Sequence, residues 1–191
     1  MLLSLVHDRE LMRESNFIPD FDIFSGEETK LGPRVCGDIH TGDLYKAAKD
    51  TYCKNKQKDF PLPLIIFYDK THTDLHGSLS TAPVMFTLGF FNQSARNSVD
   101  FWRVLGLVPN LSYGKGKNHD APSREKLQDQ HNCLKVILES ISTIWKEGGL
   151  PTTILGKEVM VQPWIHVIIG DASGNNKLCG RFNVHGNCAR P

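Results

Sequence analysis

LIIFYD at residues 64–69 is an uninterrupted apolar run that ends in an aspartate, and IHVIIGD at residues 165–171 ends in the same way. Short apolar runs of this kind are typical of β-strands that are buried on both faces. Each run stops at a carboxylate, Asp69 in the first and Asp171 in the second. The sequence therefore predicts two buried strands, 64–68 and 165–169, with an acidic residue at the carboxyl end of each.

The residues between these runs predict two more strands, one long helix and a hairpin. Strands are expected at 83–91 and 99–108, and a hairpin at 152–162 is expected to turn at Gly156-Lys157. The helix is expected over 123–147, because apolar side chains recur there every three or four residues. This stripe, which we expect to be core, comprises Leu127, His131, Leu134, Leu138, Ile141 and Trp145.

The order of these elements predicts an α/β fold with a mixed sheet. Three successive strands form an antiparallel meander, the helix follows, and the last strand returns parallel to the first by a right-handed crossover. Residues 1–57 are polar and weakly periodic apart from a helical pattern at 41–53, so we interpret them as an N-terminal arm. The domain proper is expected over residues 58–191.

Composition excludes several classes of protein. The 191 residues contain 22 Lys plus Arg and 21 Asp plus Glu, a formal net charge of +1. This balance excludes a histone-like chain and an acidic disordered one. The first residues are too short an apolar run for a signal peptide, and no stretch is apolar enough for a membrane span, so we expect a soluble intracellular protein.

Asp69 and Asp171 are the first candidate site. The carboxyl ends of parallel strands gather functional groups at one edge of a sheet. Two carboxylates that converge there need a counter-charge, and a hard cation with oxygen ligands, Mg²⁺ or Mn²⁺, supplies it. Such a site can drive phosphodiester hydrolysis. The alternative is that each aspartate only begins a turn, which Asp does often.

Cys179, His185 and Cys188 are a weaker candidate for zinc. They supply three ligands of the type that zinc takes, but no fourth follows before residue 191, and free thiols with a loop histidine are the favoured explanation. Lys115 and Lys117 lie in a glycine-rich loop. They are candidates for phosphate contacts or for an ordinary solvated loop.

The stretch PLIIFYDKTHTDLHGSLSTAPVMFTLGFFNQSARNSVDFWRVLGLVP, residues 63–109, resembles the opening of the catalytic domain in Plavaka-like transposases of the Kyakuja–Dileera–Zisupton group. The features in common are the YDKT at 68–71, Gly77, Pro83, and Arg96-Asn97 ahead of Trp102. A long helix follows, and then a strand ending VIIGDASGNNKLCGRFN. The resemblance runs from about residue 41 to the end.

The resemblance implies a ribonuclease-H-like fold with a DDE-type site, in which Asp69 is the first acid and Asp171 the second. The third acid of such enzymes, usually Glu, lies on a later helix, so we expect these 191 residues to hold only the first part of the domain. The resemblance also implies that the partner is DNA, in the form of transposon ends, and that the protein acts in the nucleus. Whether the chain forms a homo-oligomer is left open.

We therefore expect this chain to be a fragment of a DDE-type transposase, an enzyme that cleaves DNA and transfers strands. We expect little or no cleavage by this chain itself. The alternative function is a transposon-derived module that binds DNA or protein and does no chemistry. A third alternative is a pseudogene product with no role.

Overall fold

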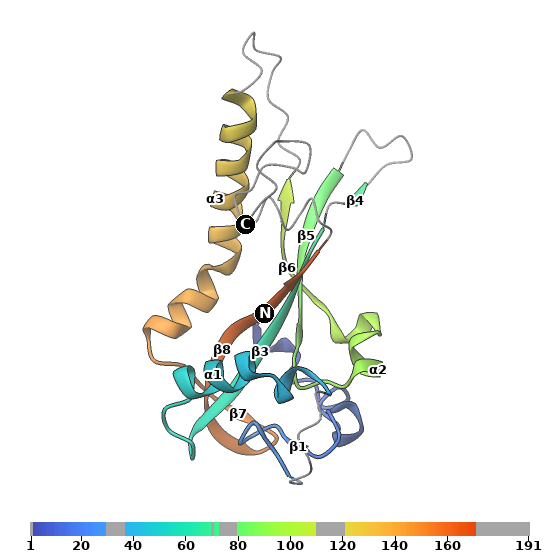
Figure 1. Cartoon of the computed structure of the whole chain (residues 1–191), viewed down its shortest axis with the longest axis vertical. Coiled ribbons are helices and arrows are strands. Elements are labelled where there is room, and N and C mark those ends of the chain that lie inside the picture. The colour runs from blue at the N-terminus through green and yellow to red at the C-terminus, as the bar shows by residue number, and fades with distance from the viewer. Residues whose placement is uncertain (1, 30–36, 70, 73–79, 110–120, 171–191) are drawn as a thin grey trace. The chain divides into compact units, whose positions relative to one another are not determined.

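The computed structural model describes residues 2–29, 37–69, 71–72, 80–109 and 121–170. Its helices and strands follow the chain in the order drawn in Figure 1. The elements are β1 (Phe21–Asp22), β2 (Glu27–Glu28), α1 (Asp43–Tyr52), β3 (Asp59–Tyr68), β4 (Thr71–His72), β5 (Ser80–Leu88), α2 (Gln93–Arg96), β6 (Arg103–Pro109), α3 (Ala121–Lys146), β7 (Leu150–Ile154) and β8 (Lys157–Ile169). Short 3₁₀ turns lie at Leu2–Ser4, Glu14–Asn16, Ile39–Thr41 and Val99–Phe101.

Within the described residues, six strands form one sheet in the order β4-β5-β3-β8-β7, with β6 on β5. β4 pairs antiparallel with the start of β5, and the amide of Gly89, directly after β5, donates to the Pro63 carbonyl of β3 over 2.8 Å. The Thr81 hydroxyl, near the start of β5, donates to the carbonyl of Val108 near the end of β6. These contacts confirm the antiparallel meander of β3, β5 and β6.

β3 and β8 are neighbours that run in the same direction (Figure 1). The amide of Met160, early in β8, donates to the carbonyl of Lys58 over 2.8 Å, and Lys58 directly precedes β3. Because this bond joins the beginnings of two strands that stay adjacent, the pair is parallel. The crossover through α3 thus returns the chain beside its first long strand, and the α/β class with a mixed sheet is confirmed.

Two prolines occur inside β3, which lies between β5 and β8. Pro61 and Pro63 lack the N–H that a central strand normally donates. Pro63 is tolerated where β5 has just ended at Leu88: its carbonyl still accepts from the amide of Gly89, and only the return bond from its own nitrogen is missing. Residues 60–66 are all buried, which confirms the strand at 64–68 as buried on both faces.

The last strand differs from the expectation in two ways. The predicted hairpin arm and the predicted strand 165–169 are one continuous strand, β8, and the hairpin turns at Leu155-Gly156 rather than one residue later. Both turn residues have positive φ, 48° and 80°, as a two-residue type I′ turn requires.

The expectation that residues 165–169 are buried is wrong. Ile165, Val167, Ile168 and Ile169 are 36–45% exposed. The physical reason is that β7 pairs only with Lys157–Val161. Within the described residues, no strand follows β7 along that side of β8, so the rest of this side stays open.

The chain divides into two compact units. Unit 1 comprises residues 1–66, 86–103 and 140–167, and unit 2 comprises 67–85, 104–139 and 168–191. The division falls within β3 after residue 66 and within β8 after residue 167, so each of these long strands contributes residues to both units.

Residues of the expected arm contribute to the core of unit 1. Phe17 meets the ring of Phe90 edge-on with centroids 5.7 Å apart, and the amide of Ile18 donates to the Phe90 carbonyl. In α1, Tyr45 is 2% exposed whereas Leu44 is 68% exposed, so the tyrosine faces the interior. The boundary at residue 57 stays a prediction.

In unit 2, α3 lies directly on β6. A Cβ added to Gly106 would stand 2.7 Å from Cγ1 of Ile137, so only glycine allows this approach of helix to strand. Further along α3, in unit 1, Ile141 and Ile144 are buried, but Trp145 is 52% exposed. The prediction of Trp145 as core is therefore wrong: at the last turn of the helix Ile144 takes the inward position.

Candidate functional site

Asp69 directly follows β3, as predicted, and is half-buried. The residue before it, Tyr68, is buried, and this burial, together with the neighbouring Cys133 thiol, raises the pKa of its hydroxyl. β3 is therefore an apolar strand with one carboxylate, that of Asp69, directly after its last residue. On β8 the equivalent point is Gly170, the last described residue.

The other predicted site residues lie outside the described residues: Asp171, Cys179, His185, Cys188, Lys115 and Lys117. In the part of the chain that is described, no group of three or more His, Cys, Asp or Glu side chains is placed to hold a metal ion. The Mg²⁺ or Mn²⁺ site at Asp69 and Asp171 and the weaker zinc site thus stay predictions.

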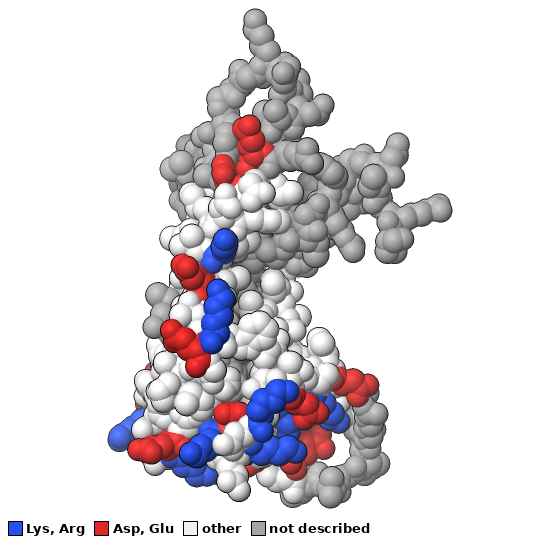
Figure 2. All heavy atoms as spheres, turned by 90° about the vertical axis from the view of Figure 1, so that its left-hand side faces the viewer, with Lys and Arg blue, Asp and Glu red and all other residues white. Residues whose placement is uncertain are grey.

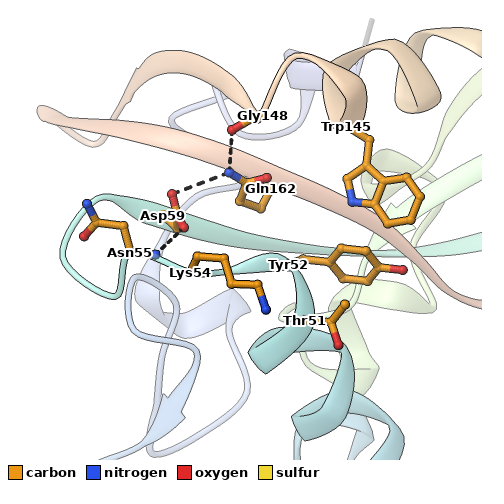
Figure 3. Close-up of a pocket in the computed structure, with 8 residues that line it drawn as sticks. All are labelled: Thr51, Tyr52, Lys54, Asn55, Asp59, Trp145, Gly148 and Gln162. Carbon is orange, nitrogen blue, oxygen red and sulfur yellow. Dashed lines mark hydrogen bonds between the residues drawn. The ribbon is translucent and has the colours of Figure 1, made fainter.

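A pocket of about 340 Å³ opens in unit 1 (Figure 3). It lies where the end of α1, the start of β3, the end of α3 and the middle of β8 come together. Its lining combines two aromatic rings with amide, carboxylate and ammonium groups. The lining residues are Thr51, Tyr52, Lys54, Asn55, Asp59, Trp145, Gly148 and Gln162.

The aromatic wall of the pocket is the outer end of a row of rings. Trp145 and Tyr52 have centroids 4.9 Å apart, and Tyr52 stacks on Trp164 at 5.7 Å with 21° between the planes. The row continues inward from Trp164 to Tyr45 and His166. Trp164 and Tyr45 are 4% and 2% exposed, so the row is anchored in the core, whereas Trp145 at its outer end is 52% exposed.

The polar wall of the pocket is built around Gln162, a side chain that is only 6% exposed. Its Nε2 donates to the Gly148 carbonyl over 2.9 Å and lies 3.5 Å from Oδ1 of Asp59. In Figure 3 the amide nitrogen points toward these two groups, and the oxygen lies on the side of Trp145. That oxygen accepts no hydrogen bond from any residue that the structure describes, so it remains available as an acceptor.

A turn rich in lysine, Lys54-Asn55-Lys56-Gln57-Lys58, borders the pocket, and all five residues are exposed. Its backbone is well ordered. The Asn55 carbonyl accepts from the amides of Lys58 and Asp59, and the Asn55 amide donates to Oδ2 of Asp59 over 2.7 Å. The Lys54 ammonium donates to the carbonyl of Asp50 at the end of α1. We call residues 54–58 the lysine turn.

Positive and negative charges are mixed on the surface drawn in Figure 2. Figure 2 shows basic and acidic side chains intermingled rather than separated on the described surface that faces the viewer. The lysine turn is a local cluster of three exposed cations. Sequence reasoning missed this site because Trp145 was assigned to the core. The signal that was present is the alternation of three lysines directly after a helix that ends in tyrosine.

The described helices include none that combines the length and the apolar composition needed to cross a membrane.

The fold and the aspartate at its central strand define a mixed α/β protein with a candidate acidic edge. A family model described as Plavaka transposase matches residues 2–190. The chain therefore belongs to the Plavaka transposase family, which confirms the resemblance and extends it over the N-terminal arm. Neither a curated protein nor a solved structure gives a significant match.

Proposed function

We propose that this chain carries part of the active site of a DDE-type DNA transposase. In this site Asp69 and Asp171 are ligands of Mg²⁺ or Mn²⁺. Carboxylate oxygens are the ligands that these cations prefer. Bound there, a metal ion would activate water or a 3′-hydroxyl for attack on a DNA phosphodiester. The partner is DNA, and the place of action is the nucleus.

The observation that carries the proposal is the parallel pairing of β3 and β8. Lys58 and Met160 are joined by a hydrogen bond, and Asp69 and Asp171 each come eleven residues later (58 to 69 and 160 to 171). In a parallel pair the residue that donates to Lys58 is paired with Asp59, so Asp69 is level with Gly170 of the neighbouring strand, and Asp171 is the next residue in the sequence. Neighbouring strands lie about 4.8 Å apart. The order of three antiparallel strands, a helix and a parallel strand also supports the ribonuclease-H-like fold.

Metal binding tests the proposal. Purified protein is titrated with Mn²⁺, and the free ion is followed by electron paramagnetic resonance. We expect weak binding, because two carboxylates alone hold such an ion poorly, and loss of that binding in both Asp69→Asn and Asp171→Asn. Asp100→Asn, an exposed carboxylate elsewhere, is the matched control. Unchanged Mn²⁺ binding in the two variants would contradict the proposal.

Cleavage is a separate measurement. We expect little Mn²⁺-dependent nicking of supercoiled DNA by the 191-residue protein. Efficient nicking that Asp69→Ala abolishes would overturn this expectation while supporting the metal site. A non-catalytic DNA-binding module instead predicts salt-dependent binding that neither Asp69→Asn nor Asp171→Asn changes.

A further inference from the structure

We propose that the pocket of unit 1 binds one unstacked nucleotide of single-stranded DNA, with the base on Trp145 and the flanking phosphates at the lysine turn. This inference rests on the proposed function in taking DNA as the partner. It concerns a different place in the chain from the two aspartates, and it requires no metal ion.

Trp145 is the natural platform for a base. Its ring contacts Tyr52, and about half of its surface remains in solvent. The rings behind it, Tyr52 and the buried Trp164, hold the row in place, so a base that stacks on Trp145 extends an ordered series of rings. Stacking of one base on an aromatic side chain strengthens binding roughly five-fold to a hundred-fold.

The polar wall selects the base rather than the phosphate. Two acceptors line this wall, the amide oxygen of Gln162 and the carboxylate of Asp59, and the ammonium group of Lys54 lies at the edge of the same pocket. A phosphate would be repelled by the Asp59 carboxylate, whereas the amino and imino N–H groups on the edge of a base can donate to these acceptors. A pocket of about 340 Å³ also lies within the range of small-ligand sites.

The lysine turn supplies the contacts to the backbone. Lys56 and Lys58 are exposed. The pKa of Glu27 is lowered mainly by Lys49 and to a lesser degree by Lys56, so Lys56 also attracts a carboxylate of this chain. Because Asn55 and Asp59 order the turn, little flexibility is lost when phosphate binds. Three lysines on single-stranded DNA predict a slope of roughly −2 in log K against log salt.

Duplex DNA does not fit this arrangement. Its bases are paired and stacked on one another, so none can reach Trp145 without being extruded. The pocket therefore favours single strands, frayed ends or unpaired nucleotides over a continuous duplex.

The test measures fluorescence anisotropy of a labelled single-stranded 12-mer in EDTA, with the 191-residue protein. The affinity of the wild type is compared with that for a 12-mer of abasic sites and for the duplex of the same sequence. We expect both to bind at least five-fold more weakly than the single strand. Equal affinity for the abasic strand or for the duplex would overturn the proposal, as would the absence of binding.

Variants locate the two halves of the site. Trp145→Leu should weaken binding to the normal strand at least five-fold and leave binding to the abasic strand unchanged. Replacing Lys54, Lys56 and Lys58 together by Gln should reduce the salt slope more than replacing Arg9, Lys46 and Lys135, three exposed cations that do not line the pocket. Equal slopes for the two triple variants, or wild-type affinity of Trp145→Leu, would contradict the proposal.

The abasic strand tests stacking without any change to the protein, so a folding defect in Trp145→Leu cannot decide the result. Asp100→Asn, an exposed carboxylate that does not line the pocket, should bind the single strand as the wild type does in EDTA. Loss of Mn²⁺ binding is measured separately, and failure of the pocket is thereby distinguished from failure of the acidic site.

Discussion

The side-chain amide of Gln162 in β8 donates a hydrogen bond of 2.9 Å to the carbonyl oxygen of Gly148, just beyond the end of α3. Gln162 is one of the few buried polar residues among those described, and its nitrogen also faces Asp59 at the start of β3. One side chain thus connects the end of the long helix to two neighbouring strands. This connection, within unit 1, also shapes the polar wall of the pocket.

Gln162→Met removes these hydrogen bonds at nearly constant volume. We expect the free energy of unfolding to fall by about 1–3 kcal/mol, because the carboxylate of Asp59 and the helix end lose a buried donor. Thermal or urea unfolding followed by circular dichroism measures the change. Gln128→Met, an exposed position on α3, is the control and should stay within about 0.5 kcal/mol of the wild type. Equal stability of the two variants would show that the hydrogen bonds of Gln162 contribute nothing.

Gly148 and Gly149 form a matched pair, since both have positive φ but differ in their surroundings. A Cβ at Gly149 would stand 2.6 Å from Nε2 of Gln162 and from Cγ of Met160, whereas one at Gly148 meets nothing within 4 Å. We therefore expect Gly148→Ala to cost about 1–2 kcal/mol from backbone strain alone. Gly149→Ala should cost about 1–3 kcal/mol more, from overpacking. Urea midpoints of the two variants decide this, and a smaller loss for Gly149→Ala would contradict it.

The turn between β7 and β8 contains a residue that is poorly suited to its conformation. Leu155 has φ of 48°, in the left-handed region, and is half exposed. Asn tolerates this region, and Asn-Gly is the favoured pair for a type I′ turn. Leu155→Asn should raise the free energy of unfolding by roughly 0.5–1 kcal/mol, and Leu155→Val should lower it. Differential scanning calorimetry measures both, and a lower melting temperature for Leu155→Asn would refute the turn geometry.

We expect His166 on β8 to make the stability of the protein sensitive to acid. Burial lowers the pKa of its ring, and Nδ1 is buried with no hydrogen-bond partner among the described residues. Above the ordinary pKa of about 6.5, the ring is neutral in both the folded and the unfolded states. As the pH falls below this value, the unfolded state takes up the proton first, so the free energy of unfolding decreases until the pH passes the folded pKa.

His166→Phe should therefore reduce the loss of stability between pH 7 and pH 5. One proton accounts for at most about 1.4 kcal/mol per pH unit, and partial solvent exposure of the ring makes the effect smaller. Some pH dependence should remain, because burial also lowers the pKa of His40. Urea unfolding at a series of pH values gives the slope. An unchanged slope in His166→Phe would show that His166 is not the group responsible.

Much of the fold was predictable because it depends on local periodicity. The apolar run at 64–68, the alternation of Val84, Phe86 and Leu88, and the helical stripe around Leu134 and Ile141 all lie where the pattern indicated. The order of strands followed from the same pattern, since a helix between the meander and the last strand lets that strand return parallel to the first by a right-handed crossover. The position of Asp69 at the tip of β3 followed from where the apolar run stops.

The errors occur where a residue's surroundings come from distant parts of the chain. An apolar run such as 165–169 predicts a buried strand, but β7 is too short to cover it. The length of the neighbouring strand cannot be predicted from the run itself. Trp145 continues the helical stripe, yet the drift of the 3.6-residue period at the last turn turns Ile144 inward in its place.

The sequence by itself determined the class of fold, the order of its strands, the aspartate at the end of β3 and the family. All of these depend on short-range patterns or on motifs read in order along the chain. Only the tertiary structure decided that Tyr52, Asp59, Trp145 and Gln162 share one pocket beside the lysine turn. These residues come from two helices and two strands, and side chains so far apart in the sequence meet only through the packing of those elements.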